Sequence, residues 1–96
     1  ESLVTRYKRD PGVIAWVLAA SNGTCEACRN PAPFSRSDQT PFLEVHHLKP
    51  LADGGPDTTD NAAACCPNCH REMHFGENGP ALTEETIKRV TRLKEY

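Results

Sequence analysis

The sequence lacks the hallmarks of several protein classes. None of its apolar runs approaches the roughly 20 residues of a membrane-spanning helix, and no secretory signal peptide is recognisable. It has no internal repeat and no low-complexity segment, and its length of 96 residues is that of one domain, so residues 1–96 are expected to form one. Because the chain begins at Glu1 and not at a methionine, we expect it to be a fragment of a longer protein.

A strong net charge is also missing. The formal charge is −2, so bulk charge does not indicate nucleic-acid binding. The positive residues nevertheless cluster near the two ends of the chain, at Arg6, Lys8, Arg9, Lys88, Arg89, Arg92 and Lys94. Each cluster is either a solvated face or part of a surface for a polyanion, which on its own would bind weakly and in a salt-sensitive way.

What the chain does contain is an unusual set of cysteines and histidines. Four of its five cysteines form two Cys-x-x-Cys pairs, Cys25 with Cys28 and Cys66 with Cys69. The odd cysteine count, this spacing and the interleaved histidines favour a metal site over a disulfide framework. Such ligands must stay reduced, so the expected compartment is the cytoplasm.

The two cysteine pairs are expected to bind one structural Zn²⁺. Two thiolates with two residues between them can reach one ion from a tight turn, and two such pairs complete a closed tetrahedron. No ligand position remains for water, so this zinc would hold the fold together and do no chemistry. The alternative is a set of free buried cysteines or an oxidised pair. The fifth cysteine, Cys65, is expected to be a small packed residue.

Local patterns predict a helix at each end of the chain and two strands between them. Asp10-Pro11 is a typical helix start and Asn22-Gly23 a typical helix end, with apolar residues at helical spacing in between. Thr83 is expected to cap the final helix. The other expected elements are strands over 42–48 and 61–66, a long loop over 50–60 and a helix from Cys69 onward.

All four histidines fall in two short segments of the sequence. His70 and His74 are four residues apart on an expected helix, so they lie on one face and can share an ion. Adjacent strand residues point to opposite faces, so only one of His46 and His47 can join them, and the other is free to handle protons. The alternative is four ordinary surface or core histidines, each satisfied without a metal.

Two other metal-enzyme motifs contain similar residues but do not fit. A zincin helix has glutamate directly after its first histidine, where this chain has Arg71. A zinc deaminase has its His-x-Glu before the Cys-x-x-Cys pair, whereas His70-Arg71-Glu72 follows the pair here. Neither chemistry is therefore expected.

The order of these residues resembles the HNH endonucleases. The resemblance rests on two histidines that end a strand, on Asn61 after a glycine-containing loop, and on a histidine that opens a helix. The two Cys-x-x-Cys pairs resemble zinc-ribbon members, and residues 43–55 resemble bacterial restriction-type members, including enzymes that cut methylated DNA. The resemblance covers about residues 24–76. It implies an α+β, small ββα-metal fold, stapled by the four-cysteine zinc and flanked by N- and C-terminal helices.

The resemblance also implies a role for each site residue. His47 matches the general base that deprotonates water, and Asn61 matches the residue that braces the long loop and so holds the base in place. His46, His70 and His74 match ligands of a catalytic divalent ion, with His74 as the third ligand. Many relatives have aspartate at the position of His46, whereas histidine there is similar to the nuclease colicins. This ligand set would accept Zn²⁺, Ni²⁺ or Mn²⁺ as well as Mg²⁺.

The implied function is metal-dependent hydrolysis of phosphodiester bonds by an HNH nuclease domain of a bacterial restriction enzyme that acts on modified DNA. DNA is the expected partner, and Arg71 either contacts a flanking phosphate or is simply solvated. Recognition of the DNA is expected from a separate domain.

Cutting both strands would require two active sites, as in a homodimer. The alternatives are a non-catalytic zinc module that binds DNA or protein, and an HNH nuclease of the toxin or homing type.

Overall fold

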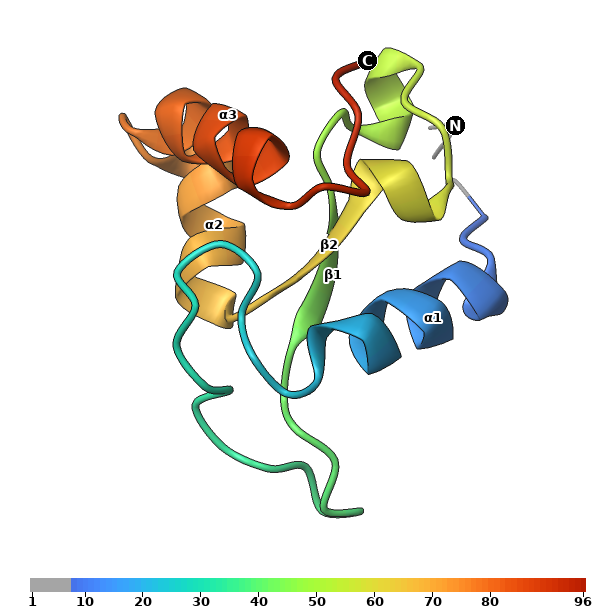
Figure 1. Cartoon of the computed structure of the whole chain (residues 1–96), viewed down its shortest axis with the longest axis vertical. Coiled ribbons are helices and arrows are strands. Elements are labelled where there is room, and N and C mark those ends of the chain that lie inside the picture. Colours follow the sequence, from blue (N-terminus) through green and yellow to red (C-terminus); the bar gives the residue numbers. More distant parts are fainter. Residues whose placement is uncertain (1–7) are drawn as a thin grey trace, which may run out of the picture.

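A two-stranded antiparallel hairpin lies at the centre of the fold (Figure 1). The structure is a computed structural model that describes residues 8–96. Strand β1 spans Glu44–His47 and pairs with β2, Ala62–Cys65, so that the first residue of each strand lies opposite the last residue of the other. All four residues of β2 are small and fully buried, which lets neighbouring elements approach both faces of the strand closely.

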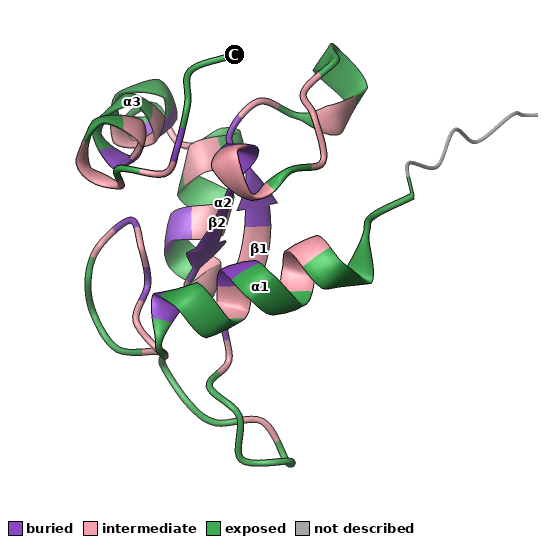
Figure 2. Cartoon of the chain, turned by 45° about the vertical axis from the view of Figure 1, so that its right-hand side comes forward, coloured by how far each residue is buried: buried purple, intermediate pink, exposed green. Residues whose placement is uncertain are grey.

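Helices cover both faces of this hairpin. The elements outside it are α1 (Pro11–Ser21), the 3₁₀ turns η1 (Leu51–Asp53) and η2 (Thr59–Asn61), α2 (Pro67–Phe75) and α3 (Gly79–Arg89). Helices α1 and α2 lie on opposite sides of the strands, and α3 packs against α2 (Figure 1). Figure 2 shows the buried residues gathered along the strands and the helix surfaces that face them. Within residues 8–96, no helix is long and apolar enough to cross a membrane.

The first helix forms where its capping residues predict it. The Asp10 carboxylate accepts a hydrogen bond from the Gly12 amide at 2.8 Å, and Pro11 occupies the first turn. Asn22 ends the helix in the left-handed region, with φ of 52°. Val17 is fully buried in the core, as the apolar spacing predicts.

The two strands are shorter than predicted. The sequence pattern predicts residues 42–48 as extended, whereas β1 covers Glu44–His47 only. The Leu43 carbonyl accepts a hydrogen bond from the Arg36 guanidinium at 3.0 Å, so this backbone group serves the preceding loop and not the sheet. The partner strand cannot extend either, because Cys66, the residue directly after β2, is already the N-cap of α2.

The other two helices begin earlier than predicted. Helix α2 starts at Pro67 and not at Cys69, because proline suits the first turn and the Cys66 sulfur accepts a hydrogen bond from the Cys69 amide. Helix α3 starts at Gly79, followed by a proline that again suits the first turn. The Thr83 hydroxyl donates to the Gly79 carbonyl at 2.9 Å from inside the helix, so its prediction as the cap is wrong.

The basic residues near the C-terminus do not form one solvated face. Arg92 makes two hydrogen bonds of 2.7 Å to the Glu26 carboxylate and two more to backbone carbonyls. Arg89 donates to the carbonyls of Glu26 and Ala27. These two arginines therefore tie the C-terminal segment to the turn of the first Cys-x-x-Cys pair. The expected basic cluster near the start of the chain falls partly on residues 1–7, which lie outside the described residues.

Candidate functional site

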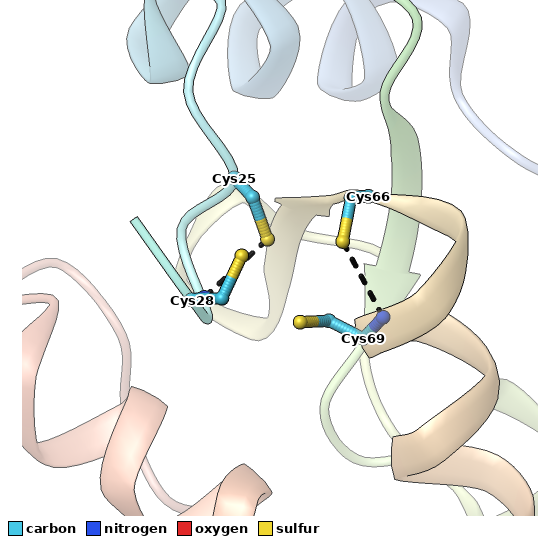
Figure 3. A group of neighbouring side chains, drawn as sticks. All are labelled: Cys25, Cys28, Cys66 and Cys69. Atoms are coloured by element: carbon cyan, nitrogen blue, oxygen red, sulfur yellow. Dashed lines mark hydrogen bonds between the residues drawn. The ribbon is translucent and has the colours of Figure 1, made fainter. Parts of the chain in front are cut away.

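The two Cys-x-x-Cys pairs meet at one point of the fold (Figure 3). Cys25 and Cys28 lie in the turn after α1, and Cys66 and Cys69 lie at the start of α2. Their four sulfur atoms are all within 4.8 Å of one another. In each pair the amide of the second cysteine donates to the sulfur of the first at 3.5 Å, so local turn geometry positions the sulfurs. The predicted tetrad therefore has the arrangement of a closed metal site.

The surroundings of these cysteines fit a bound cation. A hydrogen bond from the Cys65 thiol lowers the pKa of Cys25, whereas burial raises the pKa of Cys66 and of Cys69. A cysteine binds a metal as the thiolate. A cation within the cluster would therefore offset the free-energy cost of ionising the buried thiols. All five cysteines are free of disulfides, and Cys65 is fully buried, as predicted.

Three of the four histidines form a second group. Nitrogen atoms of His46, His70 and His74 lie within 4.8 Å of one another, and the ring centroids are 4.8 to 5.0 Å apart. His46 comes from β1, while His70 and His74 come from one face of α2. The helical spacing and the strand position therefore bring together the residues that the sequence singled out, although their role as ligands stays a prediction.

The environment of His46 fits a metal ligand. Its Nδ1 atom is buried and has no hydrogen-bond partner among residues 8–96, which is a costly arrangement for a polar atom. Burial, followed by the charges of the neighbouring histidines, lowers the pKa of His46 to about 3. Burial and the charge of His70 also lower the pKa of His74. These two rings are therefore neutral near pH 7, as metal ligands must be, so the group of rings fits a divalent cation.

Glu44 holds the His70 ring and was not predicted as a site residue. Its Oε1 atom lies 2.9 Å from Nδ1 of His70, which leaves the Nε2 atom of that ring for a metal. Carboxylates in this position orient metal-binding histidines and raise their basicity. Glu44 and His46 are two residues apart on β1 and so share the face toward α2. Strand alternation could therefore have identified Glu44.

Replacing Glu44 should weaken metal binding at the three histidines. The substitution Glu44→Gln keeps the size of the side chain but removes its charge, and loss of such a partner typically costs about 10- to 100-fold in metal affinity. Calorimetric titration of the protein with a divalent ion measures this. The exposed Glu77→Gln serves as the matched control and should leave the affinity unchanged. Equal affinities for both variants would contradict the assignment.

His47 has a different partner from the other histidines, as expected of its opposite direction on the strand. Its Nε2 atom lies 2.8 Å from Oδ1 of Asp57, and only 5% of its side-chain surface is exposed. Burial raises the pKa of Asp57, but the hydrogen bonds from the Asp10 amide and from His47 outweigh it and lower that pKa below its usual value. Asp57 is therefore ionised at neutral pH. It was not predicted as a site residue, because no local pattern in the loop indicates its contact with His47.

Asn61 is buried at the base of the loop that joins the two strands. Its side-chain oxygen accepts from the Lys49 amide at 3.0 Å, and its side-chain nitrogen donates to the carbonyls of Lys49 at 3.0 Å and Pro56 at 2.8 Å. The loop also requires Gly55, because a Cβ there would lie 2.0 Å from the Lys49 carbonyl oxygen. These contacts join the two ends of the loop, which is the geometry that bracing requires.

Removing the Asn61 side chain should slow the reaction without unfolding the protein. In Asn61→Ala the backbone groups of Lys49 and Pro56 lose their partners, but both residues are partly exposed, so water replaces part of each hydrogen bond and the cost stays below the roughly 1–3 kcal/mol of a fully buried unsatisfied group. A small displacement of a reacting group costs up to about 100-fold in rate. Circular dichroism and single-turnover DNA cleavage measure the two effects. The exposed Asn78→Ala is the control, and full activity of Asn61→Ala would remove the bracing role.

A cavity of about 240 Å³ opens beside the three-histidine group and the separately paired His47. All four histidines contribute to its lining, and so does Arg9 from the segment before α1. Arg9 therefore brings a positive charge to the cavity, which its position in the basic cluster did not predict. Arg71 is exposed on α2 and lies outside this lining, so its contact with DNA stays a prediction.

Comparison with known proteins places this geometry in context. The family model for HNH endonucleases matches residues 25–76, more than half of the chain. The type IV methyl-directed restriction enzyme EcoKMcrA of Escherichia coli (strain K12) is 50% identical over 95 residues, which cover 99% of this chain and 34% of that enzyme.

Two solved structures resemble the fold. The type IV phosphorothioation-dependent restriction endonuclease ScoMcrA has a TM-score of 0.77 and 34% identity, over 90% of this chain and 19% of that one. The modification-dependent restriction endonuclease TagI has a TM-score of 0.60 and 28% identity, over 71% of this chain and 24% of that one. The chain therefore spans about a third or less of each of these relatives.

Proposed function

The chain belongs to the HNH endonuclease family, and on this premise we propose that it hydrolyses phosphodiester bonds of modified DNA as the nuclease part of a restriction enzyme. The observation that carries the proposal is the placement of the three-histidine group and the separately paired His47 around one cavity. A non-catalytic zinc module would use the four cysteines but has no use for this second site. The three relatives compared above are restriction enzymes, which favours that class over toxin or homing nucleases.

The four histidines divide into ligands and a base. His46, His70 and His74 would hold a divalent ion, for which nitrogen ligands admit Mn²⁺, Ni²⁺ or Zn²⁺ as well as Mg²⁺. Such an ion would offset the negative charge that develops on the phosphate and on the departing 3′ oxygen. His47 accepts a proton from a water molecule, whose oxygen bonds to phosphorus in line with the 3′ oxygen that leaves. The expected products are 5′-phosphate and 3′-hydroxyl ends.

The four-cysteine cluster is the proposed site of a structural Zn²⁺. Four thiolates within reach of one point form the closed, sulfur-only set that this ion accepts without a water ligand. The core beneath it is small, since its buried side chains are largely alanine and cysteine, so the fold gains from such a staple. Free thiols of this kind persist in a reducing compartment, in keeping with a cytoplasmic protein.

DNA is the proposed partner of this site. Arg9 at the cavity and Arg71 nearby on α2 supply positive charge for phosphate groups. We assign recognition of the modification to a separate domain, because the restriction-enzyme relatives are much longer than this chain. Cleavage of both strands would bring two copies together on the DNA, so a homodimer is part of the proposal.

A plasmid-nicking assay with the intact protein tests the proposed function. We expect supercoiled plasmid that carries modified bases to be nicked when a divalent ion is present, and to stay intact after chelation. Unmodified plasmid should be cut less. Absence of nicking on every modified plasmid, or nicking that needs no divalent ion, would contradict the proposal.

A further inference from the structure

The contact between Asp57 and His47 carries an inference beyond the roles that the histidines already have. We propose that Asp57 is a positioning residue for His47: it accepts the proton on Nε2 and so keeps Nδ1 unprotonated and free to take a proton from water. This inference rests on the proposed function, because it concerns the same general base. It adds a residue that acts through the base and does not itself touch the DNA.

The carboxylate of Asp57 is held from both sides. Its Oδ1 atom lies 2.8 Å from Nε2 of His47, and its Oδ2 atom accepts the Asp10 backbone amide at 2.6 Å. A backbone N–H can only donate, so the atom of residue 57 that faces Asp10 must be an acceptor. The exposed fractions of the His47 and Asp57 side chains are 5% and 20%, so solvent competes little for the contact. The carboxylate therefore has one orientation, which presents an acceptor to the ring.

The loop that carries Asp57 is itself fixed. The residue before it, Pro56, accepts a hydrogen bond of 2.8 Å from the buried Asn61 side chain, and the Gly55 amide donates to the Pro50 carbonyl at 3.0 Å. The bracing role that the resemblance to HNH endonucleases implies for Asn61 would therefore act on the base through the backbone of Pro56 and the carboxylate of Asp57.

The chemical consequence is the choice of tautomer. A neutral imidazole carries a proton on one of its two nitrogens. The other nitrogen is the only one that can act as a base. An ionised carboxylate at Nε2 keeps the proton there, so Nδ1 is the basic nitrogen. It also stabilises the imidazolium that forms when the ring takes a second proton from water.

The substitution Asp57→Asn reverses this choice. The asparagine must turn its oxygen toward the Asp10 amide, which leaves its NH₂ group facing Nε2 of His47. That nitrogen can then only accept, so the ring proton moves to Nδ1 and the base is blocked. We expect kcat for DNA cleavage to fall by about 10²- to 10⁴-fold, with KM and metal content unchanged. The Asp53→Asn variant, in the same loop but exposed, is the matched control and should behave as wild type.

Ring ¹⁵N NMR of the intact protein reports the tautomer independently of cleavage. The His47 proton should be on Nε2 in wild type and in Asp53→Asn, and on Nδ1 in Asp57→Asn. An Asp57→Asn variant with the wild-type tautomer or with unchanged kcat, while the wild type cuts DNA, would overturn this inference alone. A wild-type protein that cuts no DNA would overturn the proposed function itself, whichever tautomer the spectrum shows.

Discussion

The His47→Ala variant is expected to lose DNA cleavage while it keeps both metals. A general base contributes about 10²- to 10⁴-fold to the rate. Among residues 8–96, no other side chain that lines the cavity is placed to replace His47, since the three other histidines lie together as a separate group. The ring makes its hydrogen bond to Asp57 and not to the proposed ligands, so its loss should leave the metal site intact. Single-turnover cleavage and metal analysis of the same preparation measure both quantities.

A second histidine variant separates the base from the ligands. His70→Ala should also lose cleavage, but it should do so by losing the divalent ion, because His70 is one of the three grouped rings and is oriented by Glu44. The two variants therefore differ in metal content and not in activity. Cleavage by His47→Ala at the wild-type rate would refute the base assignment, and a loss of metal from that variant would show that His47 is a ligand.

The Cys69→Ser variant is expected to unfold. Apparent binding energies of structural zinc in small zinc-binding peptides are about 10–16 kcal/mol at pH 7. The free energy of unfolding of a small domain is about 5–15 kcal/mol. Loss of the ion therefore removes a free energy as large as the whole stability of the fold. Cys69 is also buried in the first turn of α2. The N-cap of this helix is Cys66, whose sulfur accepts a hydrogen bond from the Cys69 amide. Thermal denaturation followed by circular dichroism should show no cooperative transition for this variant.

The remaining cysteine supplies the control for that experiment. Cys65 is fully buried but lies outside the tetrad, so Cys65→Ala removes a thiol without removing a proposed ligand. We expect it to retain zinc and a cooperative transition, with a loss of stability of about 1–2 kcal/mol for the small cavity that results. A Cys69→Ser protein as stable as Cys65→Ala would show that the tetrad does not hold the fold.

Much of the fold was predictable because its signals are local. Asp10 and Asn22 lie at the caps where α1 begins and ends, and the spacing of the cysteine pairs already implies two tight turns. The separation of His46 from His47 follows from strand alternation alone. The start of α3 was missed because Thr83 satisfies the usual preference for a cap, whereas the helix begins a turn earlier at Gly79.

The residues that sequence reasoning missed are those whose contacts depend on the path of the chain. Asp57 reaches His47 only because the loop between the strands folds back on the hairpin, and its second oxygen meets the start of α1. Arg89 and Arg92 resemble an exposed basic cluster in the sequence, yet they bind the turn of the first cysteine pair from more than 60 residues away. No local pattern encodes contacts between segments so far apart.

Metal analysis of the purified protein and of His46→Ala tests the central claim that the chain carries two independent metal sites, one for stability and one for cleavage. We predict two metals per chain in the wild type and one in the variant, which should stay folded and lose divalent-dependent nicking of modified plasmid. A single metal in the wild type, or a variant that keeps both metals and its activity, would contradict the account.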